Sequence, residues 1–128
     1  MVGYLILAVL SFGLSGIAEA VMDTLQFKFS ESVFKDKNQM FWNPQISWQN
    51  KWKDGCPKFG ERFWGSSTYF VFVTDAWHLF KWIRNRFIDI SIFSLTMMAL
   101  SFWYSLFITI FISVLSKLLF EKSFHSFS

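Results

Sequence analysis

The sequence predicts an all-α integral membrane protein with two firm transmembrane helices, a short re-entrant or third spanning helix and an aromatic-rich loop. Residues 90–116 carry no charge. As one helix they would extend about 40 Å, enough to cross a hydrocarbon core of about 30 Å. Residues 2–22 form a second apolar segment, which only Glu19 interrupts. Hydrophobic residues make up 53% of the 128-residue chain and charged residues only 16%, which is typical of a single small membrane domain.

The first helix is expected at about residues 2–23 and is expected to remain on the mature protein. Ala18-Glu19-Ala20 resembles the small-residue cleavage site of a signal peptide. The first four residues, however, include no Lys or Arg, and the apolar pattern continues beyond Ala20 to Leu25. Both features favour an uncleaved helix over a signal peptide.

Small and polar residues form a stripe on each predicted membrane helix. On the first helix the stripe contains Ser11, Ser15, Glu19 and Asp23. On the last helix, expected at about residues 88–117, it contains Ser94, Ser101, Ser105, Thr109, Ser113 and Ser116. Small residues and hydroxyls let membrane helices approach closely and bond to each other. The two stripes are therefore predicted to face one another.

The connection at about residues 24–67 is predicted to be an aromatic and basic loop at the membrane surface. Lys51, Lys53, Lys58 and Arg62 alternate with Trp and Phe residues there. Such a pattern can bind nucleic acid, but beside a membrane span it is far more often a headgroup-level anchor. The expected partner is thus the lipid bilayer, and nucleic acid is not expected. The loop's basic residues place it in the cytoplasm, with the N-terminus outside the inner (cytoplasmic) membrane of a bacterium.

A third apolar segment is predicted to form a short helix at about residues 68–83, with Ser66-Ser67-Thr68 as its N-cap. The apolar run within it, residues 69–83, contains 15 residues. As a helix this run would extend only about 22 Å, which is short for a membrane crossing. Asp75 and His78 also lie in its middle. A re-entrant helix and a third span therefore both remain open. Residues 118–128 are expected to form an interfacial tail.

Four ionisable residues form the candidate site: Glu19 and Asp23 on the first helix, and Asp75 and His78 on the short one. Ionisable residues in membrane segments usually face a protein interior or an aqueous cavity. Three carboxylates and one imidazole suit a divalent metal or a proton relay. All four are therefore candidate metal ligands, and Asp23, Asp75 and His78 are candidate catalytic residues. The alternative is solvated carboxylates beside a structural Asp75–His78 pair.

Five strings of the sequence carry a resemblance. They are Ala20-Val21-Met22-Asp23-Thr24-Leu25-Gln26-Phe27, Phe41-Trp42-Asn43-Pro44, Ser47-Trp48-Gln49-Asn50-Lys51-Trp52-Lys53, Phe63-Trp64-Gly65-Ser66-Ser67-Thr68 and Thr74-Asp75-Ala76-Trp77-His78. Through them, residues 16–82 resemble uncharacterised small integral membrane proteins of Bacteroidetes-type bacteria and their phages. The resemblance implies membrane localisation, and it favours Asp23, Asp75 and His78 over Glu19. It implies no activity.

Two functions are expected. The first is a membrane-embedded polar site that acts on a lipid headgroup, an ion or a proton. The alternative is a non-enzymatic membrane scaffold or holin-like assembly protein, which forms a homo-oligomer through its hydroxyl stripe. Convergence of the four ionisable groups around a cavity would favour the site. Dispersed carboxylates and a stripe that faces another copy would favour the scaffold.

Overall fold

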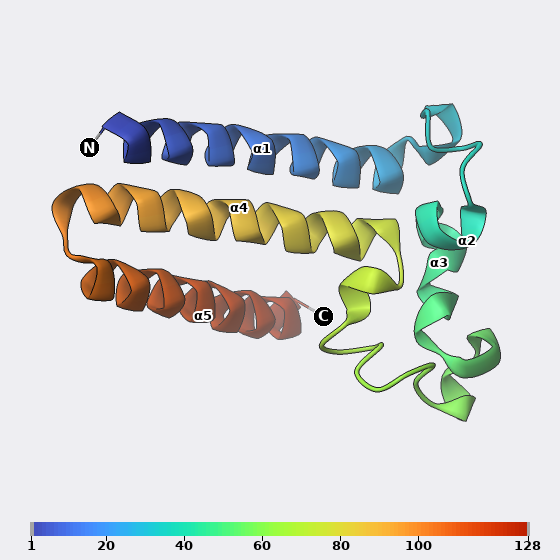
Figure 1. Ribbon diagram of the computed structural model, residues 1–128. Coiled ribbons are helices and arrows are strands. Elements are labelled where there is room, and N and C mark those ends of the chain that lie inside the picture. Colours follow the sequence, from blue (N-terminus) through green and yellow to red (C-terminus); the bar gives the residue numbers. More distant parts are fainter. Residues whose placement is uncertain (1, 128) are drawn as a thin grey trace. The chain divides into compact units, whose positions relative to one another are not determined.

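The computed structural model describes residues 2–127, and side chains for residues 2–118. The described residues form helices and turns with no β-strand, so the all-α prediction is confirmed (Figure 1). The long helices are α1 (Val2–Phe27), α4 (Ala76–Ala99) and α5 (Phe102–Phe127). Between α1 and α4 lie the short helices α2 (Gln39–Trp42) and α3 (Pro44–Ser47). The 3-10 turns are Phe29–Glu31, Trp48–Lys51, Lys53–Gly55, Pro57–Phe59 and Val71–Val73.

The chain divides into two compact units, which are described separately. The apolar unit contains the N-terminal part of α1, up to Leu14, together with the chain from Arg86 onward. The aromatic unit is Ser15–Asn85, which includes the rest of α1, the short helices and the start of α4. The division follows composition, because the charge-free segments lie in the first unit and most charged residues in the second.

The predicted helix over residues 88–117 is wrong, because its charge-free segment folds as two helices. α4 ends at Ala99 and α5 begins at Phe102. The Ser113 hydroxyl on α5 donates to the Asp89 carboxylate on α4, and the Phe93 and Phe102 rings meet edge-on at 5.7 Å. α5 therefore runs back along the C-terminal half of α4. The turn contains neither glycine nor proline. Hydropathy measures only the total apolar length, so it could not locate this turn.

Small residues form the buried positions of the apolar unit. Those positions are Ala8, Ser11, Ser91, Ser94, Ser105 and Thr109. The Ser91 hydroxyl lies 2.9 Å from the Phe87 carbonyl oxygen and 3.1 Å from that of Ala8 on α1. The C-terminal half of α4 thus contacts both neighbouring helices in this unit. Of the predicted hydroxyl stripe, Ser94, Ser105 and Thr109 are buried against protein, whereas Ser101 and Ser116 are exposed.

The buried residues of α1 follow one another at alternating steps of three and four positions. Its members are Ala8, Ser11, Ser15, Ala18, Met22 and Leu25. The predicted stripe, at constant steps of four, holds only for Ser11 and Ser15, whereas Glu19 and Asp23 are exposed. Each step of four turns a helix about 40° past a full rotation. Two further steps therefore carry the stripe away from the buried face.

Large apolar side chains lie mostly on the surface. No described phenylalanine is buried, although the chain contains 18. Phe12 on α1 is 69% exposed and Trp103 on α5 is 75% exposed. Among the described residues, α1 is the one helix long and apolar enough to cross a membrane, and the apolar part of α5, Phe102–Leu118, is shorter. Helices of this kind also occur as signal sequences and in soluble cores.

Two smaller predictions also change. The helix expected at residues 68–83 begins only at Ala76 and continues to Ala99, because Asp75 rather than Ser66-Ser67-Thr68 precedes its first turn. The connection expected at residues 24–67 is not a plain loop, since it includes α2, α3 and several 3-10 turns. The backbone of the predicted tail continues α5 to Phe127, and the expected interfacial face of residues 119–128 lies outside the described side chains.

Leucine at position 105 should destabilise the protein. Ser105 is 0% exposed, so the larger side chain must separate the packed helices, at a cost of about 1–3 kcal/mol. Ser116→Leu is the matched control, because Ser116 is exposed on the same helix. Thermal unfolding in detergent should show a lower Tm for Ser105→Leu alone. Equal Tm values for the two variants would contradict the described packing.

Candidate functional site

The candidate site includes Asp75, which caps the N-terminus of α4. Asp75 is 2% exposed, and its carboxylate Oδ1 accepts a hydrogen bond from the backbone N–H of His78 at 2.9 Å. A carboxylate at this position satisfies a free helix amide and faces the positive end of the helix dipole. The Thr74 hydroxyl lies 3.2 Å from Oδ2. Local helix chemistry thus fixes the Asp75 side chain.

His78 binds the same carboxylate through its ring. Nδ1 lies 2.8 Å from Oδ1 and 2.9 Å from Oδ2 of Asp75. An ionised carboxylate only accepts hydrogen bonds, so Nδ1 must carry the proton and Nε2 is the remaining ring nitrogen. Lys51 Nζ lies 3.4 Å from that Nε2. We call these three residues the Asp75–His78–Lys51 array.

The environment of Asp75 keeps its carboxyl group ionised. Burial by itself raises the pKa of Asp75. Hydrogen bonds from the His78 ring and backbone, together with the positive charges of His78 and Lys51, outweigh burial and lower this pKa below its ordinary value of 3.8. A negative charge is therefore held against the imidazole of His78.

Lys51 reaches the array because its backbone is tied down by distant residues. The Lys51 carbonyl oxygen accepts hydrogen bonds from the hydroxyl of fully buried Ser66 at 2.7 Å and from the Arg62 amide at 2.9 Å. The neighbouring Asn50 amide donates to the carbonyl oxygen of Thr74 at 3.0 Å. Asn50 thus links this segment to the turn that leads into Asp75.

Further cations lie close to the array. Lys81 Nζ sits 5.0 Å from the centre of the Trp77 ring. Burial, together with the positive charges of Arg84 and Lys51, lowers the pKa of Lys81 from 10.5. Glu19 binds Arg84 at 2.7 Å. The basic side chains of Lys51, Lys81 and Arg84 therefore outnumber the carboxylates of Asp75 and Glu19 in this region.

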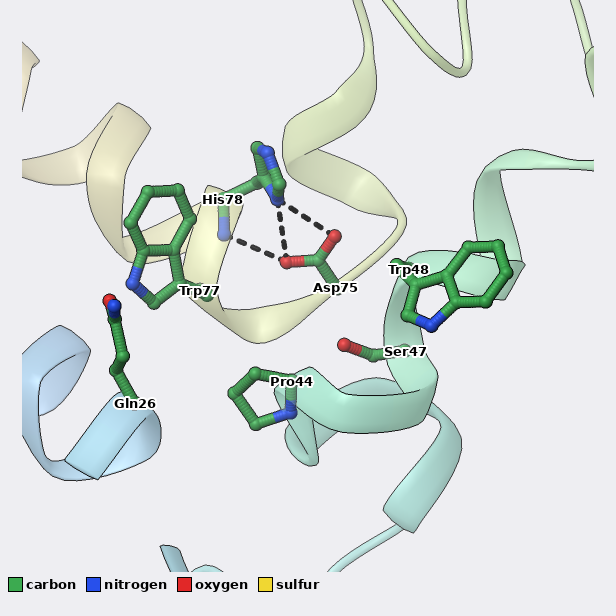
Figure 2. A pocket seen from close by; sticks show the side chains of 7 residues that line it. All are labelled: Gln26, Pro44, Ser47, Trp48, Asp75, Trp77 and His78. Atoms are coloured by element: carbon green, nitrogen blue, oxygen red, sulfur yellow. Dashed lines mark hydrogen bonds and ion pairs between the residues drawn. The ribbon is translucent and has the colours of Figure 1, made fainter. Parts of the chain in front are cut away.

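A cavity of about 190 Å³ adjoins the array. It is lined by Gln26, Pro44, Ser47, Trp48, Asp75, Trp77 and His78. Figure 2 shows the hydrogen-bonded Asp75–His78 pair on one side of the cavity, between Trp77 and Trp48. The arrangement combines polar groups at one edge with two indole walls. It suits a small anionic group attached to an apolar body.

The structure brings together two of the four predicted site residues. Asp75 and His78 form the expected pair, whereas Glu19 pairs with Arg84 and Asp23 is exposed. Among the described residues, no group of three or more His, Cys, Asp or Glu side chains could hold a metal ion. The predicted divalent metal site of Glu19, Asp23, Asp75 and His78 is therefore corrected. Arg84 compensates the charge of Glu19, and helix drift turns Asp23 outward.

Lys51 and Asn50 were not predicted as site residues. They contact α4 and the turn before it from 27 and 24 residues away, through a loop whose path no periodic pattern encodes. The only sequence signal was their place within one of the five resembling strings. No family model, curated protein or solved structure matches the chain, so the comparisons assign it no function.

Replacing Asp75 should separate its charge from its capping role. A carboxyl with a lowered folded pKa stabilises the fold above its ordinary value, and this contribution is lost as pH falls below 3.8 toward the lower folded value. Asp75→Asn retains the cap and should flatten the loss of stability below about pH 4. Asp75→Ala also removes the cap and should cost about 1 kcal/mol at pH 7.

Denaturant unfolding in detergent at several pH values measures both effects. Glu31→Gln is the control, because Glu31 is exposed and its removal should leave the acid slope unchanged. An Asp75→Asn variant with the wild-type acid slope would contradict the ionised, bonded carboxylate.

Proposed function

We propose that this is an integral membrane protein whose aromatic unit binds the phosphate of an anionic lipid headgroup. The Asp75–His78–Lys51 array carries the proposal, because it places Lys51 Nζ 3.4 Å from His78 Nε2, next to an indole-walled cavity that Asp75 and His78 line. The basic side chains around the site outnumber the carboxylates. An anion would bind there with charge-assisted hydrogen bonds, which are stronger than neutral ones.

Membrane insertion is supported by the inverted distribution of side chains in the apolar unit. Serine, alanine and threonine are buried, whereas phenylalanine, leucine and isoleucine lie on the surface. Contiguous exposed apolar area of this extent is rare in soluble monomers. In lipid, exposed apolar chains cost nothing and small residues drive helix pairing. α1 then crosses the bilayer, and the α4–α5 hairpin lies beside it.

The hairpin also supports the orientation. No Lys or Arg occurs before Lys28 or between Arg86 and Lys117. Because α5 runs antiparallel to α4, Lys117 lies toward the Arg86 end of the apolar unit. Arg86 and Lys117 therefore flank the same end of the α4–α5 hairpin, and Lys28 follows directly after α1 in the sequence. The positive-inside rule then places the aromatic unit in the cytoplasm and the N-terminus outside, as in a bacterial inner membrane.

The N–H groups of His78 and Lys51 would recognise the phosphate as hydrogen-bond donors. With Nδ1 bonded to Asp75, Nε2 is the ring nitrogen left for a ligand, and in the doubly protonated ring its N–H donates to a phosphate oxygen. Lys51 donates to the same phosphate. The Lys51 amine lies 3.4 Å from Nε2, in the position from which this nitrogen would accept a substrate proton. This geometry favours binding over general-base catalysis.

A scaffold that assembles through the hydroxyl stripe is less well supported. Ser94 and Ser105 are 0% exposed within a single chain, and Thr109 is 8% exposed. These hydroxyls are therefore already covered and offer no surface to another copy.

Anionic lipid should stabilise the wild-type protein through the array. In nanodiscs of mixed phosphatidylcholine and phosphatidylglycerol, Tm should exceed that in phosphatidylcholine alone by about 5 °C, or about 1 kcal/mol of preferential binding. Lys51→Met and Lys81→Met should remove most of this increase. Lys37→Met, at an exposed lysine of the same unit, should retain it. Equal lipid responses in Lys51→Met and wild type would overturn the proposed site.

The orientation predicts that the only thiol, Cys56, is cytoplasmic. A membrane-impermeant maleimide should label Cys56 in lysed or inverted membranes but not in intact cells. Labelling in intact cells at the rate seen after lysis would place the aromatic unit outside and reverse the topology.

A further inference from the structure

An exposed aromatic loop lies outside the proposed headgroup site. The apolar run Tyr69-Phe70-Val71-Phe72-Val73 precedes α4 instead of forming part of it. Tyr69 is 73% exposed and Val73 is 52% exposed, while nearby Trp64 is 76% exposed. We call residues 62–73 the Trp64 loop. Exposure of these apolar side chains to water costs free energy.

Hydrogen bonds to Glu61 hold the backbone of the Trp64 loop. The Glu61 carboxylate accepts hydrogen bonds from the Gly65 amide at 2.9 Å, from the Ser67 amide at 3.1 Å and from the Ser67 hydroxyl. Gly65 has a φ of +74°, which a side chain would strain, and an added Cβ would lie 3.2 Å from the Phe70 ring. The loop conformation is thus fixed while its aromatic side chains point outward.

The rings of the loop form a continuous series. Trp64 stacks on Tyr69 with ring centres 5.7 Å apart, and it contacts Phe70 at 5.8 Å. Phe70 contacts Phe72 at 6.1 Å, and Phe72 stacks on Trp82 of α4 at 5.0 Å. The exposed rings are therefore braced against the helix that begins at the Asp75 cap.

Cations flank this aromatic surface. Arg62 is exposed at the start of the loop, and Lys53 and Lys58 are exposed on the adjoining segment. The Lys53 amide donates to the Gly60 carbonyl oxygen, and Trp52 pairs with Glu61, so the two segments lie together. Amphipathic Trp and Tyr rings beside Lys and Arg have the chemistry of the zone between lipid headgroups and acyl chains.

We propose that the Trp64 loop inserts its aromatic side chains into the headgroup region of the bilayer and docks the aromatic unit on the membrane surface. The occupant of this surface is lipid, since exposed rings bordered by cations complement an anionic interface. The inference relies on the proposed membrane insertion of the chain. It does not rely on headgroup binding at Lys51 and His78, because neither side chain belongs to the loop.

A spin label at position 64 tests the insertion. Cys56→Ser removes the only thiol, and Trp64→Cys or Tyr69→Cys then supplies one attachment point in the full-length protein. In proteoliposomes of phosphatidylcholine and phosphatidylglycerol, power-saturation EPR compares collisions with oxygen and with a water-soluble nickel chelate. We expect the oxygen-to-nickel ratio to be several-fold higher at 64 and 69 than at a label on Val33→Cys. Val33 is 79% exposed in the same unit, and the neighbouring Phe34 and Trp42 rings stack on each other and are half-buried rather than exposed.

The outcomes are distinguishable. Equal ratios at 64 and 33 would overturn the insertion, and so would low access to both reagents at 64, which would indicate a protein contact. Flotation with the liposomes is measured on the same samples. Loss of flotation would refute the membrane proposal itself, whereas flotation with a water-exposed label at 64 would refute only the loop inference.

Discussion

Close packing of small side chains between helices is the constraint on which the structure depends. In the apolar unit, Ser91 reaches the Ala8 carbonyl and Ser105 is fully covered, so the backbones must lie near one another. A larger residue at either position would separate the helices. The same arrangement leaves the large side chains outside, where only a hydrocarbon environment removes the cost of their exposure. Helix packing and the proposed location in the membrane therefore have one physical origin.

Residue spacing in the sequence predicted the features that depend on a single helix. The first helix, the buried Ser11 and Ser15, and the pairing of Asp75 with His78 all follow from spacing on a single helix. The hairpin turn at residues 100–101 could not be predicted, because an uninterrupted apolar run fits one long helix as well as two shorter ones. The start of α4 was misplaced since Ser66 is used elsewhere: its hydroxyl holds the Lys51 backbone. The Glu19 prediction failed because Arg84, 65 residues away, binds its carboxylate.

The candidate site combines two sets of residues, and only one of them could be predicted from the sequence. Asp75 and His78 are positioned by the helix they begin, so any chain with this cap would orient them similarly. Lys51 is positioned by Asn50, Arg62 and Ser66 from a loop with little regular structure. All residues that line the cavity lie within four short segments of the sequence, residues 20–27, 41–44, 47–53 and 74–78. These segments thus contribute to one cavity of the aromatic unit, although they are scattered along the sequence.

Alkaline carbonate extraction of membranes that contain the full-length protein tests the central claim most directly. High pH strips proteins held by charge or surface contact but leaves inserted helices in the lipid. If exposed apolar side chains on α1 and α5 face acyl chains, the protein should remain in the membrane pellet and require detergent for release. Recovery in the supernatant as a monodisperse species without detergent would show that water tolerates this surface, and it would contradict the account.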